Sequence, residues 1–188
     1  LARADAFRAS FGLSRRQALW AIRALRDEEL PLFAAASARE GERVAETGEV
    51  AVTLRAMPEG GEVVEDYRHV GLSLRRHPVA FLREDLRRRR IVSCAEAMEA
   101  RDGSWLETAG IVLVRQRPGS ASGVVFITIE DETGIANLVI WPKVTEANRR
   151  VILTAPMIAV RGRIQREGEV VHLVARSFTD LSGDLAGV

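Results

Sequence analysis

Cysteine is almost missing from this sequence of 188 residues, which holds only Cys94. A lone cysteine cannot close a disulfide within the chain, and it cannot build a zinc site of several cysteines. Uncharged apolar runs are short, and the first residues, LARADAFRAS, do not place a basic start before an apolar stretch. We therefore expect no membrane span and no signal peptide, and we expect the protein in the cytoplasm.

Lysine is nearly absent as well, because Lys143 is the only lysine among 27 basic residues. The basic residues are balanced by 26 acidic residues, which excludes a nucleic-acid binder that relies on overall positive charge. Any such binding must come from local patches. The hydrophobic fraction of 47% is high enough for one or two compact units and argues against wholesale disorder.

Residues 1–33 carry apolar side chains at spacings of three and four, which predicts a helical segment. Gly12 and Ser14, an expected N-cap, favour two short helices, and Pro31 closes the segment. Residues 34–66 hold eight carboxylates against three arginines and few large apolar residues. Such a composition cannot offset the entropy of ordering, so it predicts an extended or mobile acidic linker.

Residues 67–103 are predicted to form a helical connector. Pro78 suits the first turn of a helix, and residues 93–96, Ser-Cys-Ala-Glu, form the pattern of a capping box that opens another helix. Four consecutive arginines, residues 87–90, stand where the first of these helices should end. Positive charge is favoured there by the helix dipole, and the run is either a phosphate-contacting patch or a solvated helix end.

From residue 104 onward the hydrophobic period changes to two, which is typical of strands. The expected strands are 106–117, 124–130, 135–141, 157–165 and 169–178, with a helix at 142–154 and a tail at 179–188. Five strands with one helix between the third and the fourth is the order of the OB-fold, a Greek-key barrel that commonly binds oligonucleotides. The predicted class is thus α+β: helical segment, linker, helical connector, and a five-stranded OB barrel over residues 104–178.

Alternation within the strands sorts the side chains of the barrel into two faces. The expected inward set is Val125, Ile127, Ile129, Ala136, Leu138, Ile140, Ile158, Val160 and Ile164. Aromatic and basic residues then face outward, a combination that holds single-stranded nucleic acid by stacking and charge. The candidate binding residues are Arg115, Arg117, Phe126, Thr128, Asn137, Trp141, Lys143, Arg161, Arg163 and Arg166. The alternative is that the aromatic residues pack at the barrel ends and the arginines form an ordinary solvated face.

Catalytic chemistry finds no support in the sequence. The acidic residues 130–132 occupy a hairpin turn with no converging partner, so turn chemistry explains them. His69, His77 and Cys94 match no zinc-binding spacing, and phosphate loops and nucleophile motifs are missing. We predict no catalytic residue, no metal site and no cofactor in this segment.

Four blocks of the sequence resemble, in the same order, the C-terminal part of the error-prone DNA polymerases of bacterial family C, relatives of the polymerase III alpha subunit. The blocks are LARADAFRASFGLSRRQALWAIRAL, VVEDYRHVGLSLRRHPVAFLREDL, AGIVLVRQRPGSASGVVFITIEDETGIANLVIWPKV and VRGRIQREGEVVHLVA. The resemblance implies that residues 1–30 are the end of a helix-hairpin-helix region that grips duplex DNA. It implies that residues 104–178 are an OB domain near the single-stranded template.

The same resemblance implies a division of labour. The family copies damaged templates with low fidelity, and its catalytic palm, with the aspartates that bind Mg²⁺, lies upstream of this region. In its replicative relatives a short peptide with a glutamine start docks on the sliding clamp. Residues 29–33, Glu-Leu-Pro-Leu-Phe, keep the apolar anchor but begin with Glu29, so we expect weak or no clamp binding by this peptide.

Three functions compete at this point. The first is a non-catalytic DNA-binding segment of an error-prone polymerase. The second is an OB module that docks accessory mutagenesis proteins. The third, an anticodon-binding OB domain of a tRNA synthetase, explains the barrel but not the helical blocks before it.

Overall fold

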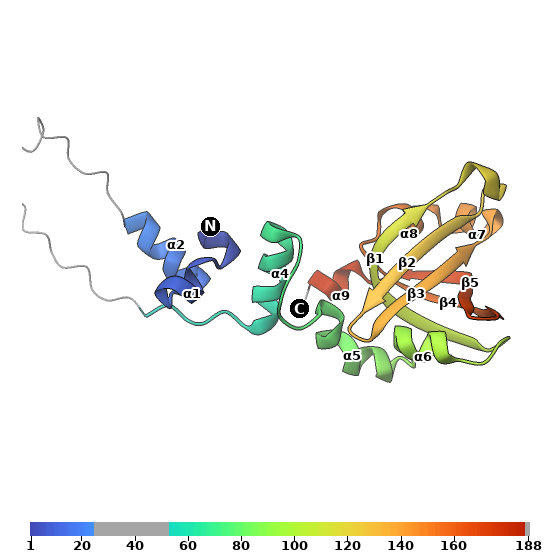
Figure 1. Ribbon diagram of the computed structural model, residues 1–188, viewed down its shortest axis with the longest axis horizontal. Coiled ribbons are helices and arrows are strands. Elements are labelled where there is room, and N and C mark those ends of the chain that lie inside the picture. Colours follow the sequence, from blue (N-terminus) through green and yellow to red (C-terminus); the bar gives the residue numbers. More distant parts are fainter. Residues whose placement is uncertain (25–52, 187–188) are drawn as a thin grey trace, which may run out of the picture. The chain divides into compact units, whose positions relative to one another are not determined.

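The computed structural model describes residues 1–24 and 53–186. The chain forms two compact units, residues 1–72 and residues 73–188, which are described separately below (Figure 1). The clamp-like peptide at residues 29–33 lies outside the described residues, as does most of the predicted linker. Within the described part of the chain, no helix is long and apolar enough to cross a membrane.

The first unit is helical, as predicted. Its elements are η1 (Ala2–Ala4), α1 (Phe7–Phe11), α2 (Arg15–Ala24) and α4 (Glu59–Val70). Helix α1 ends at Gly12, which adopts a left-handed conformation with φ 66° and joins α1 to α2. Ser14 caps α2 as expected: its hydroxyl accepts a hydrogen bond from the Gln17 backbone N–H at 3.4 Å, and the Gln17 side chain accepts one from the Ser14 N–H at 2.9 Å.

Helix α4 corrects the predicted linker, because it begins at Glu59, inside the stretch expected to be extended. The reason is a buried charge. The guanidinium of Arg15, only 1% exposed, lies 3.2 Å from a carboxylate oxygen of Glu62 and pairs with Asp66. Two of the carboxylates that suggested a linker by composition are therefore the groups that fix α4 against α2.

The second unit opens with α5 (Pro78–Arg88) and α6 (Cys94–Glu99). Pro78 occupies the first turn of α5, and Ser93 with Glu96 forms a complete capping box at the start of α6. Both predicted start signals are confirmed.

A closed five-stranded barrel follows, in the order β1-β2-β3-β5-β4, and confirms the α+β class and the OB-fold. Its strands are β1 (Trp105–Gln116), β2 (Val125–Asp131), β3 (Gly134–Ile140), β4 (Met157–Glu167) and β5 (Val170–Asp180), with η2 (Gly119–Ala121) between β1 and β2. The predicted helix at 142–154 is two helices, α7 (Pro142–Ala147) and α8 (Arg149–Thr154). Apolar residues of α6, α7 and α8 pack against the barrel interior.

The predicted tail also differs from the structure, because β5 runs on to Asp180 and α9 (Ser182–Ala186) follows it. Two local interactions explain this continuation. The Asp180 carboxylate accepts a hydrogen bond from the Ser182 N–H at 2.9 Å, and Leu181 is buried.

Strand alternation placed the barrel core correctly: all nine residues expected to face inward are buried. A second, smaller cluster lies outside the barrel, where α5 and α9 cover the paired halves of β1 and β4. Its buried members are Val79, Leu86, Ile91, Ala109, Met157, Ala159 and Leu181. That part of the outer surface is closed to ligands, which limits a binding face to the uncovered part of the barrel surface.

Candidate nucleic-acid interface

An open hollow of about 510 Å³ lies on the outer surface of the barrel alongside β4 and β5. Two indole rings border it, those of Trp105 and Trp141, which are 57% and 55% exposed. Positive charge comes from three further lining residues, Lys143, Arg163 and Arg176. We call this site the indole hollow.

Strand register explains how residues far apart in the sequence meet at the indole hollow. Trp105 at the start of β1 pairs with Arg163 of β4, and Arg163 pairs in turn with Val174 of β5. Val174 pairs with Val139 of β3, and Trp141 follows directly after the end of β3. Because side chains at paired positions lie on the same face of a sheet, these residues form one outward row.

The cations of the indole hollow are available to a ligand. In the described part of the chain, the structure shows no ion pair and no hydrogen bond for the side chains of Lys143, Arg163 and Arg176. The Arg163 side chain lies over Gly103, where a Cβ would come within 3.1 Å of its Nη2 atom. The Asp102 carboxylate also lines the hollow, but it accepts a hydrogen bond from the Arg166 N–H at 2.9 Å.

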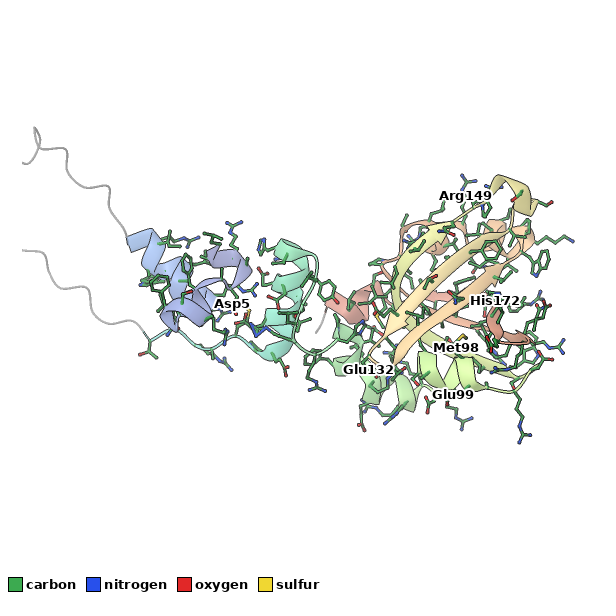
Figure 2. The ribbon with its side chains drawn as sticks, in the orientation of Figure 1. Asp5, Met98, Glu99, Glu132, Arg149 and His172 are labelled. Carbon is green, nitrogen blue, oxygen red and sulfur yellow. The ribbon has the colours of Figure 1, made fainter. Side chains whose placement is uncertain are left out.

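A second hollow, of about 360 Å³, lies beside the end of β1. Arg117 and Arg149 line it, together with Pro142 and Glu146 of α7, and none of its lining residues is aromatic. Figure 2 shows Arg149 at the end of the barrel where α7 and α8 lie, and Glu132 at the opposite end beside α5. We call this second site the arginine hollow.

Two of the predicted binding arginines are exposed but also serve the fold. Arg115 donates from Nε to the carbonyl oxygen of Ile152 at 2.7 Å and also donates to the carbonyl of Ala155, where α8 ends. Arg166 donates to the carbonyls of Met98 and Ala100 at 2.7 and 3.2 Å, where α6 ends. Each guanidinium therefore satisfies carbonyl groups that a helix end leaves without partners.

The ten predicted residues divide between the hollows and the rest of the surface. Trp141, Lys143 and Arg163 line the indole hollow, and Arg115 and Arg117 line the arginine hollow. The five others line neither of the two hollows; they are Phe126, Thr128, Asn137, Arg161 and Arg166. Among these, the Thr128 hydroxyl donates to the Asn137 side-chain oxygen at 3.1 Å, which occupies both groups.

Sequence reasoning missed Trp105, Arg149 and Arg176. Trp105 was left out because the first strand was expected to begin one residue later. Its outward position follows from alternation, since Leu106 packs against the barrel core. Alternation also places Arg176 outward, since Leu173 and Ala175 of β5 are buried, whereas Arg149 carries no such signal because its approach to the arginine hollow depends on how α8 packs.

At the β2–β3 turn, Asp131 performs the turn chemistry expected of the acidic residues, whereas Glu132 pairs with Arg83 of α5 at 2.5 Å, so the expectation that no partner converges on this turn was wrong. The Asp131 carboxylate accepts hydrogen bonds from the Thr133 backbone N–H at 2.8 Å and from the Thr133 hydroxyl at 2.6 Å. It also accepts one from the Cys94 N–H at 2.8 Å and pairs with Arg83 at 2.6 Å, which no sequence pattern indicated.

Burial raises the pKa of the Cys94 thiol to about 12, so this thiol stays protonated and unreactive at neutral pH.

Within the described residues, no group of three or more His, Cys, Asp or Glu side chains is placed to hold a metal ion. His77 illustrates the point: its Nδ1 atom accepts a hydrogen bond from the Val79 N–H at 3.2 Å and so caps α5. The chemistry that the two hollows offer is therefore stacking and charge.

Comparison with known proteins agrees with this geometry. Residues 107–181 match the family described as an OB-fold nucleic acid binding domain. The chain is similar to error-prone DNA polymerase 1 of Agrobacterium fabrum, with 66% identity over the whole chain and 17% of that protein. An error-prone DNA polymerase of Rhodopseudomonas palustris is 53% identical over 98% of this chain and 15% of its own length. Among solved structures, asparaginyl-tRNA synthetase from Pyrococcus horikoshii covers 47% of this chain and 22% of its own, with a TM-score of 0.40 and 23% identity.

The chain thus spans about a sixth of the length of the curated relatives that it matches, 17% for the polymerases of A. fabrum and Rhizobium meliloti. The match extends over all 188 residues with both, at 66% and 65% identity, and includes the helical blocks before the barrel. The resemblance stated from the sequence is confirmed: the chain belongs to the error-prone DNA polymerases of bacterial family C, as a counterpart of their C-terminal OB region.

Proposed function

We propose that this chain is a non-catalytic DNA-binding segment of an error-prone polymerase, and that its barrel holds the single-stranded template at the indole hollow. The observation that carries the proposal is the convergence of Trp105, Trp141 and three cationic side chains on one open site. An indole face can stack on any base, and a cation beside it can contact the adjoining phosphate. Such a site binds a single strand without demanding a particular sequence.

The proposed role for the whole protein follows from the family. The palm and its Mg²⁺ would perform nucleotide transfer upstream of this segment, in the cytoplasm, on damaged as well as intact templates. This segment would keep the template strand extended on its way to that site. Its own residues supply binding and orientation.

Fluorescence anisotropy with a labelled single-stranded oligonucleotide tests the proposal. Replacing Trp141 by Ala should weaken binding about tenfold, which corresponds to the loss of one stacked base. Trp20→Ala is the matched control for single-strand binding, because Trp20 is a similarly exposed indole, at 49%, in the other unit of the chain, whose expected contact is with duplex DNA. We expect Trp20→Ala to leave the affinity unchanged.

Two arginine variants distinguish binding at the indole hollow from binding by a generally basic surface. Arg163→Gln should weaken binding and lower the slope of log affinity against log salt by about 0.7, the contribution of one phosphate contact on a single strand. Arg161→Gln removes a neighbouring exposed arginine that lines neither hollow and should have little effect. Equal losses from both variants, or no binding at any salt concentration, would contradict the proposal. Failure to bind DNA together with capture of accessory mutagenesis proteins would favour docking.

A further inference from the structure

Helix α7 lies between the two hollows and contributes to both. Lys143 and Val144 face the indole hollow, while Pro142, Thr145 and Glu146 face the arginine hollow. Trp141, the residue before α7, borders the first hollow. A ligand that leaves the indole hollow past Trp141 therefore meets the arginine hollow on the other side of a helix of only six residues.

The two hollows differ in the chemistry that they offer. The indole hollow has aromatic surface for bases, whereas the arginine hollow has none and offers guanidinium groups. Of its arginines, Arg115 is held by the carbonyls at the end of α8. In the described part of the chain, the structure gives the exposed guanidinium groups of Arg117 and Arg149 neither an ion pair nor a hydrogen bond. A guanidinium binds a phosphate diester through paired N–H donors and needs no stacking surface.

From this arrangement we infer that the arginine hollow is a second subsite of the same strand, in which Arg117 and Arg149 bind the sugar-phosphate backbone after it has crossed α7. The inference rests on the proposed function, because it extends the path that begins at the indole hollow. It adds a directional claim: bases stack on one side of α7 only, and on the other side the strand is held by its phosphates alone. Glu146, which lines the arginine hollow, opposes the phosphates and limits their affinity.

The test is a length series of oligo(dT), from roughly 4 to 16 nucleotides, the range that single OB folds cover. The double variant Arg117→Gln, Arg149→Gln is compared with the unaltered chain at each length. The shortest oligonucleotides can fill only the indole hollow, so they should bind both proteins equally. The longest should bind the variant about tenfold more weakly in low salt, with a salt slope reduced by about 1.4 for two lost phosphate contacts.

Two further variants sharpen the result. Glu146→Gln removes the carboxylate from the arginine hollow and should tighten binding of long oligonucleotides by about threefold while leaving short ones unchanged. Arg150→Gln is the matched control, because it removes the same charge from the next residue of α8, which lines neither hollow. It should change neither affinity nor salt slope at any length.

The outcomes separate the inference from the proposed function. If Trp141→Ala weakens binding at every length but the Arg117 and Arg149 variant changes nothing, the second subsite is wrong and the proposed function stands. Equal weakening of short and long oligonucleotides by the arginine variant would also overturn the subsite, because a contact beyond α7 cannot affect a strand too short to reach it. If Trp141→Ala has no effect at any length, the proposed function itself fails.

Discussion

At the scale of single residues, the carboxylate of Asp131 is the most constrained charged group of the barrel unit. Its side chain is fully buried and is shared between the β2–β3 turn, the first turn of α6 and Arg83 of α5. We predict that Asp131→Asn lowers the free energy of unfolding by about 1 to 3 kcal/mol, because it removes the fully buried one of the two carboxylates that pair with Arg83 and leaves Glu132 as the other. Urea unfolding at pH 7, followed by circular dichroism, measures the loss.

The pH dependence of that loss has a definite sign. Burial works against ionisation of Asp131, but hydrogen bonds from Thr133 and Cys94 and the charge of Arg83 outweigh it and lower its pKa. A lowered pKa in the folded state stabilises the fold above the ordinary aspartate pKa of about 3.9, and the stabilisation disappears as pH falls through the folded value. The difference between the unaltered chain and Asp131→Asn should therefore be full at pH 7 and shrink below about pH 4. Glu132→Gln is the comparison, since it removes the other carboxylate partner of Arg83, whose side chain is 21% exposed, and should cost less; a difference between the unaltered chain and Asp131→Asn that grew towards low pH would contradict the assignment.

At the scale of elements, closure of the barrel depends on two glycines where strands approach unusually closely. A Cβ at Gly162 of β4 would stand 2.3 Å from the Val174 carbonyl oxygen of β5, and one at Gly110 of β1 would stand 2.5 Å from the Glu130 carbonyl oxygen of β2. Both obstacles are backbone atoms of a paired strand and cannot rotate away. Gly162→Ala should lower the free energy of unfolding by about 1 to 3 kcal/mol through overpacking.

The matched control for this prediction is Gly119→Ala in η2. A Cβ at Gly119 meets nothing within 4 Å, so the substitution should leave the midpoint of thermal unfolding almost unchanged. Because Gly162 stands between Arg161 and Arg163, Gly162→Ala should also weaken binding of single-stranded DNA. A stable Gly162→Ala variant with normal DNA binding would show that β4 and β5 can separate at this point without cost.

The helices and strands also show which features of the fold and the site could be predicted from the sequence and which could not. Alternation within one strand predicted the inward residues of the barrel and the outward positions of Trp141 and Arg163, because a strand has a fixed period of two. The meeting of Trp105 with Arg163 depends instead on the register between β1 and β4, which lie more than 50 residues apart in the sequence. No local pattern encodes that register. The same limit applies to Arg115 and Arg166, whose carbonyl partners come from distant helices.

At the scale of the whole molecule, the amino-acid composition led to a wrong prediction where charged side chains are buried. Residues 34–66 were expected to be a linker because carboxylates dominate them, yet Glu62 and Asp66 are 5% and 8% exposed in α4. Composition counts charges without their partners, and the partner here is Arg15, more than 40 residues earlier in the sequence. The acidic character of the stretch and the helix at its end are therefore compatible.

Because each unit has its own buried residues, a substitution that destabilises one unit should leave the stability of the other unchanged. Arg15 belongs to the first unit, and its guanidinium pairs there with Glu62 and Asp66. Arg15→Met removes the buried cation that Glu62 and Asp66 share, while Arg8 still lies 3.6 Å from Glu62, and should destabilise that unit by about 1 to 3 kcal/mol. Amide hydrogen exchange should then speed up in α2 and α4, while the barrel strands keep their protection and the chain keeps its affinity for short oligo(dT).

Arg16→Met is the control for this experiment, because Arg16 is exposed and donates one hydrogen bond, at 3.1 Å, to the Arg55 carbonyl. It should leave exchange in α4 nearly unchanged. Slow exchange in α4 of the Arg15 variant would show that apolar contacts such as those of the fully buried Val63 suffice to hold the helix. Faster exchange in the barrel strands of the same variant would show that the two units unfold together, since the lost charge pair lies wholly within the first unit.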